Sequence, residues 1–156
     1  MESIDAGNWR GSWAWSLPLI VLTVLIHVLG LQFINDRVVR VLSGAMARRR
    51  FIPLFAAVMG VTALLATILH GVEVTIWALV YRHLGALPDD KAAMLYSLSA
   101  MTSYGHANLF LEQQWQLMGA LEALNGMLLF GLTTAFLLAM IQKVWPLGSR
   151  GRHWKA

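Results

Sequence analysis

The chain has 156 residues, of which 58% are hydrophobic and only 13% are charged, with a net charge of +4. Soluble domains are about 45–50% apolar, so this composition excludes an ordinary soluble domain and predicts a protein embedded in a lipid bilayer. The sequence has no cysteine, which excludes disulfide bonds and thiolate metal sites. It shows no catalytic triad, phosphate loop or metal-ligand motif at a recognisable spacing. We therefore expect neither enzymatic activity nor a bound cofactor.

Residues 1–15 carry Glu2 and Asp5 and lack the basic start of a signal peptide, so we expect the first apolar segment to be retained. A membrane-spanning helix needs about 20 mostly apolar residues. Residues 16–34 form the first predicted span, with Pro18 in its first turn. The basic residues 35–52 follow, and Asn35 is a candidate start for a short interfacial helix. A solvated basic linker is an equally good interpretation of this segment.

Two further segments, residues 53–80 and 117–144, are also apolar and long enough to span a membrane. Lys and Arg residues are concentrated in residues 35–52 and in the tail, residues 145–156. By the positive-inside rule this pattern places both basic segments in the cytoplasm and the N-terminus outside. Because this placement explains the net charge, we expect membrane lipid as a partner and no nucleic acid.

The segment between the second and third spans has an unusual pattern. Pro88, Asp89 and Asp90 form a helix-start signal, and the apolar run to residue 101 is about half the length needed to cross the membrane. A polar stretch, residues 102–108, follows it. Non-helical backbone at membrane depth is tolerated only inside protein or along a watery cavity. The pattern predicts a re-entrant half-helix, residues 89–101; the alternative is a surface helix with a loop on the headgroups.

These motifs, together with Trp115, Asn125-Gly126 and Phe130-Gly131-Leu132-Thr133-Thr134-Ala135, resemble the pore module of the tetrameric potassium-channel superfamily. In particular, the chain is similar to small bacterial ion-channel proteins or to two-pore-domain-like potassium-channel proteins, and the resemblance covers residues 53–142. The resemblance implies an all-α membrane protein in a bacterial inner membrane. It also implies a homotetramer with a pore module, residues 53–144, and a peripheral first span. The filter would bind a permeant monovalent cation, K⁺ in the family.

The filter implied by the resemblance is atypical. Laid without gaps on the family's T-V-G-Y-G-D pattern, Ser103 takes the Thr position and the following residues take the next five; a second register would lay Tyr104-Gly105 on the Tyr-Gly pair. The ion-binding residues implied are Thr102, Ser103, Tyr104, Gly105, His106, Ala107 and Asn108. Ala107 stands where the family has its second glycine, so potassium selectivity is not simply inherited.

His106 introduces a titratable ring with an unperturbed pKa of about 6.5. Four such rings around an axis would oppose one another's protonation. We hypothesise that external acid reduces cation flow through His106; the alternative is a ring that points away from the pore and hydrogen-bonds Asn108.

Further along, Gly126 matches the flexible glycine of the family's inner helices, and a helical stripe would line or gate the conduit: Gly126, Phe130, Thr134 and Leu138. Ordinary helix packing is the alternative for that stripe. Four ionisable or amide residues in the outer halves of the second and third spans are predicted to form a polar cluster: His70, Glu73, Glu122 and Asn125.

Two other functions remain open from the sequence. His27 and His70 on neighbouring spans would suit a b-type haem, which makes a small electron-transfer membrane protein an alternative. That model leaves the half-helix and the polar stretch unexplained. The second alternative is a non-conducting membrane subunit derived from a channel.

Overall fold

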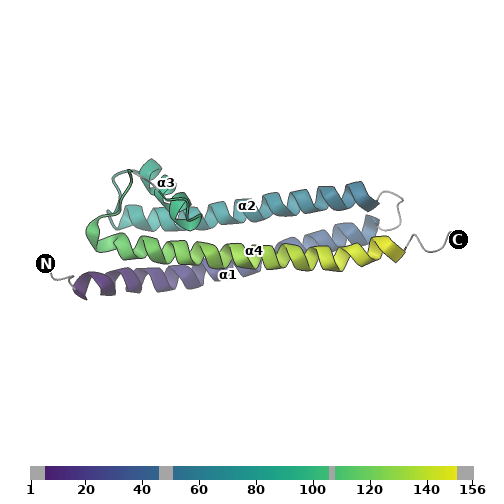
Figure 1. The fold of residues 1–156 in the computed structure, drawn as a ribbon, viewed down its shortest axis with the longest axis horizontal. Coiled ribbons are helices and arrows are strands. Elements are labelled where there is room, and N and C mark those ends of the chain that lie inside the picture. Colours follow the sequence, from purple (N-terminus) through teal and green to yellow (C-terminus); the bar gives the residue numbers. More distant parts are fainter. Residues whose placement is uncertain (1–5, 46–50, 106–107, 151–156) are drawn as a thin grey trace. The chain divides into compact units, whose positions relative to one another are not determined.

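The computed structural model describes residues 6–45, 51–105 and 108–150, and its elements are helical (Figure 1). In chain order they are α1 (Ala6–Ala45), α2 (Phe51–His83), α3 (Asp90–Met101), the 3-10 turn η1 (Gln113–Trp115) and α4 (Gln116–Arg150). Three helices contain segments long and apolar enough to cross a membrane: Trp9–Val38, Pro53–His83 and Gln113–Gln142. The predictions of an all-α fold and of three such helices are confirmed.

The first helix differs from its prediction at both ends. It begins at Ala6 instead of residue 16, and Pro18 lies inside it. A proline within an apolar helix is tolerated where neighbouring groups satisfy the freed carbonyl. Asn35 does not start a separate helix, because α1 continues through it to Ala45 and its side-chain amide donates to the Asp36 carboxylate, 3.3 Å away.

The later helices also extend beyond the predicted spans. Whereas we predicted residues 53–80 and 117–144, α2 runs from Phe51 to His83 and α4 from Gln116 to Arg150, so each helix is longer than its predicted span. A short helix, α3, is found at the residues predicted for the half-helix, with Asp89 as its N-cap accepting from the Ala92 N–H at 2.7 Å.

The helices contribute to two compact units, which we name by their cores. The polar-core unit comprises residues 1–27 and 70–130, and its apolar centre includes Val74, Trp77, Met118 and Leu129. The apolar-core unit comprises residues 28–69 and 131–156, and its centre is Leu31, Ile34, Val38 and Met140. α1, α2 and α4 each contribute residues to both units, whereas α3 belongs to the polar-core unit alone.

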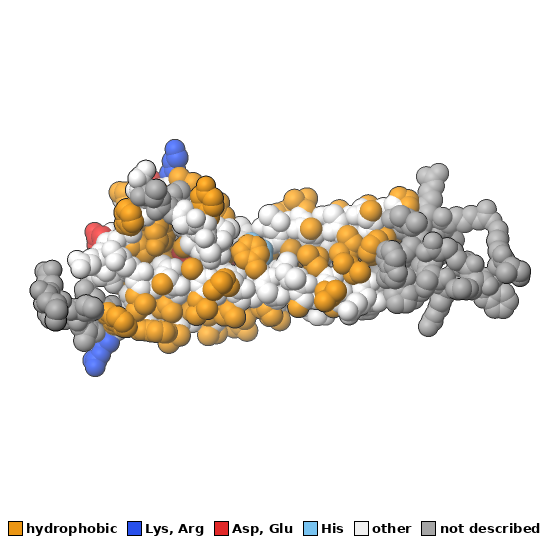
Figure 2. Space-filling view, viewed as in Figure 1, with side chains coloured by type: hydrophobic (Ala, Val, Ile, Leu, Met, Phe, Trp, Pro, Cys, Tyr) orange, Lys and Arg blue, Asp and Glu red, His pale blue; other side chains and the backbone are white. Residues whose placement is uncertain are grey.

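The outward faces of the long helices are apolar. Large hydrophobic side chains such as Leu29, Leu64, Leu79 and Leu138 are more than half exposed. On the face drawn in Figure 2, the visible Lys, Arg, Asp and Glu side chains gather toward the end where α3 begins. An exposed apolar surface of this extent on a folded chain needs lipid or another protein to cover it. The surface therefore fits a membrane protein, as the composition predicts.

Candidate functional site

The end of α3 is closed by a tight turn. The Ser103 N–H donates to the Ala100 carbonyl and the Tyr104 N–H donates to the Ser99 carbonyl, each over 2.9 Å. This pair of bonds is the Schellman pattern that terminates many helices, and it places one residue in the left-handed region. That residue is Ser103, with φ 54°. The turn is therefore held by the last carbonyls of α3, at some cost in backbone strain.

The residues of this turn are exposed in the single chain. Thr102, Ser103, Tyr104 and Gly105 are all exposed, and Tyr104 has 82% of its surface accessible. Gly105 has φ 76°, a conformation that glycine adopts readily and other residues resist. A polar, strained segment thus lies uncovered between two long apolar helices.

Two glycines of α4 set the position of α3 along it. A Cβ at Gly126 would overlap the backbone carbonyl of Met101, the last residue of α3. Seven residues earlier (126 − 119), a Cβ at Gly119 would overlap the Tyr96 hydroxyl. Residues without a side chain permit this close approach. Both ends of the contact between α3 and α4 therefore depend on glycine.

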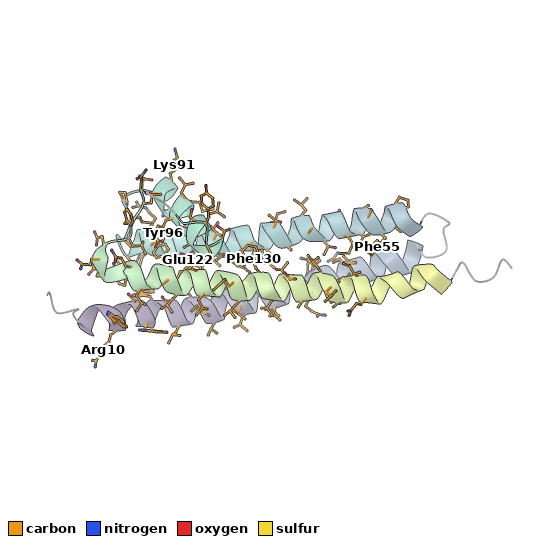
Figure 3. The ribbon with its side chains drawn as sticks, in the orientation of Figure 1. Arg10, Phe55, Lys91, Tyr96, Glu122 and Phe130 are labelled. Atoms are coloured by element: carbon orange, nitrogen blue, oxygen red, sulfur yellow. The ribbon has the colours of Figure 1, made fainter. Side chains whose placement is uncertain are left out.

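Between those glycines, Glu122 is a fully buried carboxylate that joins three helices. The Tyr81 hydroxyl donates to Glu122 Oε2 over 2.7 Å. Ser97 Oγ lies 2.5 Å from Glu122 Oε1 and 2.9 Å from the Val74 carbonyl oxygen. Tyr96 of α3 lies beside this group (Figure 3). The Glu122 carboxylate therefore ties α2 and α3 to α4.

A second buried polar group connects α1 and α2. His27 Nδ1 lies 2.8 Å from Glu73 Oε1, and His70 Nδ1 lies 3.1 Å from Glu73 Oε2. The two imidazole centroids are 5.0 Å apart, and the Phe130 ring stacks on His70 at 4.4 Å. Both His27 and Glu73 are fully buried. The Glu73 carboxylate therefore contacts two imidazoles, and neither it nor His27 of α1 is accessible to solvent in the single chain.

A third polar contact links α1 to α4. The Asn125 side-chain amide donates to Thr23 Oγ1 over 2.9 Å, and both residues are fully buried. Thr23 in turn donates to the Leu19 carbonyl of its own helix at 2.9 Å. The Asn125–Thr23 hydrogen bond therefore joins α4 to α1, and the second hydrogen bond of Thr23 fixes its hydroxyl against the backbone of α1.

A groove of about 340 Å³ lies next to the turn, between α3, the segment that follows it and the start of α4. Its walls are a mixture of aromatic, hydroxyl and small residues: Tyr96, Ser99, Ala100, Ser103, Gly105, Leu109, Phe110, Leu111, Gln116, Gly119, Ala120 and Ala123. Residues of the predicted filter segment and of α3, the helix that precedes it, therefore line the same groove.

The sequence-predicted filter residues are placed in part. Thr102 to Gly105 form the exposed turn and Asn108 is exposed, whereas His106 and Ala107 lie outside the described residues. Of the predicted pore-lining stripe, Gly126 is buried against Met101 and Phe130 stacks on His70. The other two, Thr134 and Leu138, are exposed residues of the apolar-core unit.

The predicted polar cluster is divided into three contacts in the polar-core unit. His70 and Glu73 associate with His27, Glu122 with Tyr81 and Ser97, and Asn125 with Thr23. Sequence reasoning gave His27 no part in this cluster and overlooked Thr23. The signal that would have found them is their spacing of four residues (27 − 23), which puts both on one face of the first span.

The fold and the site define the class as an all-helical protein with three helices long and apolar enough to cross a membrane. Comparisons with protein-family models, with curated proteins and with solved structures find no match to this chain.

Proposed function

We propose that several copies of this protein, four in the arrangement that the sequence resemblance implies, surround a pathway for monovalent cations across a membrane. The observation that carries the proposal is the position of the exposed turn at the end of α3. Met101 lies against Gly126, and Gly126 is 13 residues (126 − 113) into the span Gln113–Gln142. At 1.5 Å per residue this is about 20 Å along a span of about 45 Å. The turn thus belongs near the midplane.

Backbone groups at that depth need covering, because hydrocarbon offers them no hydrogen bonds. The turn is uncovered in one chain, and large apolar side chains beside it are exposed as well, among them Leu98, Phe110 and Met127. A ring of copies covers the apolar side chains with protein and leaves the polar turns facing a shared, watery axis. One chain supplies too few helices to enclose such a path.

The turn offers the chemistry that a cation needs. Its hydroxyl and carbonyl oxygens are neutral ligands that replace part of the water shell of an ion. The C-terminal, negative end of the α3 dipole points at the same place. The buried Glu122 group and the two glycine contacts hold α3 in position behind the turn. In this proposal the N-terminus is outside, the basic segments are cytoplasmic, and the membrane is a bacterial inner membrane.

The absence of cysteine from the sequence allows a direct test of the shared axis. Tyr104→Cys is expected to form disulfide-linked dimers upon oxidation in membranes, because the side chains of symmetry mates converge. Leu79→Cys, also exposed but on an outward face of α2, is the matched control and should stay monomeric. Equal cross-linking of the two variants, or none at Tyr104→Cys, contradicts the proposal.

Ion passage is tested by reconstitution into liposomes with K⁺, Na⁺ and H⁺ fluxes measured side by side. We expect cation flux above that of protein-free liposomes, lost in Gly105→Ala because alanine resists φ 76°, and retained in Gly71→Ala, where no described atom would meet the added Cβ. Cross-linking without flux would favour the non-conducting subunit. External acid is expected to reduce the flux, and His106→Ala to abolish that response.

The haem alternative is tested by the visible absorbance of the purified protein. The two imidazoles converge on one carboxylate with centroids 5.0 Å apart. To bind a haem iron from opposite faces, they would have to separate and release Glu73. The geometry therefore supports the cation pathway better.

A further inference from the structure

We propose that His27, His70 and Glu73 bind one divalent transition-metal ion per chain, of the zinc type. Each residue offers one ligand atom, and the three atoms lie within 4.8 Å of one another. They come from two helices and are buried. This inference does not depend on whether the protein conducts ions.

The distances fit a metal with small adjustments. Zinc binds imidazole nitrogen and carboxylate oxygen at about 2.0–2.2 Å, so tetrahedral ligand atoms are about 3.3 Å apart. The two histidine nitrogens lie 2.8 and 3.1 Å from the carboxylate oxygens of Glu73. The tetrahedral separation falls within the range from 2.8 to 4.8 Å given by these distances and by the 4.8 Å limit on the three ligand atoms, so side-chain rotations would have to equalise the separations around one ion.

The charge balance also points to a cation. Glu73 is fully buried, and in the described part of the chain its ion-pair partners are His27 and His70, with no Lys or Arg among them. A buried carboxylate without a positive partner is costly in an apolar bundle. The compensating charge must therefore come from a proton on an imidazole or from a metal ion. A metal satisfies the carboxylate and both nitrogens at once.

The ligand set selects the class of metal. Two imidazoles and one carboxylate with an open fourth position form a common zinc site, and imidazole ligands also suit cobalt, nickel and iron. Mg²⁺ and Ca²⁺ prefer sites made of oxygen atoms. The His70 side chain is 11% exposed, whereas those of His27 and Glu73 are fully buried, so His70 is the ligand closest to the surface of the chain.

A metal at this place would cross-link α1 to α2, because His27 belongs to the first helix and the other two ligands to the second. Bound metal stabilises the native state by mass action. We therefore expect the purified protein to unfold at a higher temperature with metal than after treatment with a chelator.

The test is titration of the chelator-treated, detergent-solubilised protein with Co²⁺, whose visible absorbance reports tetrahedral binding, followed by competition with Zn²⁺. We expect one Co²⁺ per chain in the wild type, displaced by Zn²⁺. His27→Gln and Glu73→Gln should lose this binding. His83→Gln, which changes an exposed histidine of α2, and His106→Gln should keep it.

A ligand replacement covers the case in which the glutamine variants do not fold. Because the chain contains no cysteine, His27→Cys introduces the single thiolate, and a bound Co²⁺ should then show an intense sulfur-to-metal band in the near ultraviolet. The proposal is overturned by a wild type without saturable binding, by His27→Gln and Glu73→Gln variants that still bind one Co²⁺, or by a folded His27→Cys protein that lacks the sulfur band.

Discussion

The polar-core unit and the apolar-core unit bury different kinds of side chain. Of the buried polar residues in the described part of the chain, all but Thr62 belong to the polar-core unit. Several of them bond between helices, as Glu122 does with Tyr81 and Ser97, whereas Ser99 bonds to the Leu95 carbonyl of its own helix. Thr62 likewise bonds to the Val58 carbonyl of its own helix. Polar groups between helices are costly unless each has a partner, so they specify one arrangement. The function we propose accordingly lies in the polar-core unit.

Left-handed backbone conformations follow the same division. The described residues with positive φ, namely Gly85, Ser103 and Gly105, all belong to the polar-core unit. Two of them are glycines, which adopt this conformation readily, whereas Ser103 is strained, and such strain is maintained only where the surroundings impose it. Substitutions in the polar-core unit should therefore have larger effects than matched substitutions in the apolar-core unit.

The largest effect is expected from Gly126→Ala. The new Cβ would overlap the Met101 backbone, which cannot rotate away, so we expect a loss of about 1–3 kcal/mol or more in the free energy of unfolding. In the apolar-core unit, a Cβ at Gly30 would meet the flexible end of Leu69, and one at Gly131 would meet no described atom. Denaturant unfolding in mixed micelles should show little loss for Gly30→Ala and none for Gly131→Ala. Equal losses at all three positions would contradict the comparison.

The next effect is expected from Glu122→Leu. The change removes the acceptor of the Tyr81 hydroxyl and one of the two acceptors near the Ser97 hydroxyl. The free energy of unfolding should fall by about 1–3 kcal/mol. Glu122→Gln keeps an acceptor oxygen and should lose less. In the apolar-core unit, Met140→Leu conserves volume and should cost below about 1.5 kcal/mol. Thermal unfolding of the three variants in detergent measures the order of their stability losses. A Glu122→Leu protein as stable as the wild type would show that Glu122 does not hold α3 in position.

Ser103→Gly should stabilise the protein. Ser103 has φ 54°, and releasing a side chain from the left-handed region returns about 1 kcal/mol. Gly85 occupies the equivalent position after α2, where the Ala86 N–H donates to the Tyr81 carbonyl, so Gly85→Ala should destabilise by a similar amount. If denaturant unfolding shows that Ser103→Gly raises the stability and Gly85→Ala lowers it, the left-handed conformation at both turns is confirmed. A loss of stability in Ser103→Gly would mean that its hydroxyl has a structural role.

The smallest effect is expected for the Thr23–Asn125 contact. A double-mutant cycle with Thr23→Val and Asn125→Leu should give a coupling energy of about 0.6 kcal/mol, the usual size for a hydrogen bond between membrane helices. Because Thr62 bonds within its own helix, a cycle of Thr62→Val with Asn125→Leu should give a coupling near zero. Coupling of the same size in both cycles would indicate a general effect of the substitutions.

Local patterns predicted part of the candidate site. The helix-start signal at Asp89 placed α3, since capping depends on a few neighbouring residues. Sequence spacing brought His70 close to Glu73 for the same reason. The contacts of Glu122 with Tyr81 and Ser97 were not predicted, because residues on three helices meet only after the helices have packed. Nor did the pattern reveal that Gly126 receives the Met101 backbone and is buried there.

The sequence by itself determined the class of the protein: its apolar composition and three long apolar segments require helices of membrane length, since an open backbone is not tolerated in hydrocarbon. It also determined the short helix α3 and the polar stretch that follows it. Only the tertiary structure decided which polar groups share a partner, and it placed His27 at the carboxylate of Glu73. The physical reason is that helix formation depends on neighbours within a few residues, whereas a buried polar group finds its partner through the packing of distant segments.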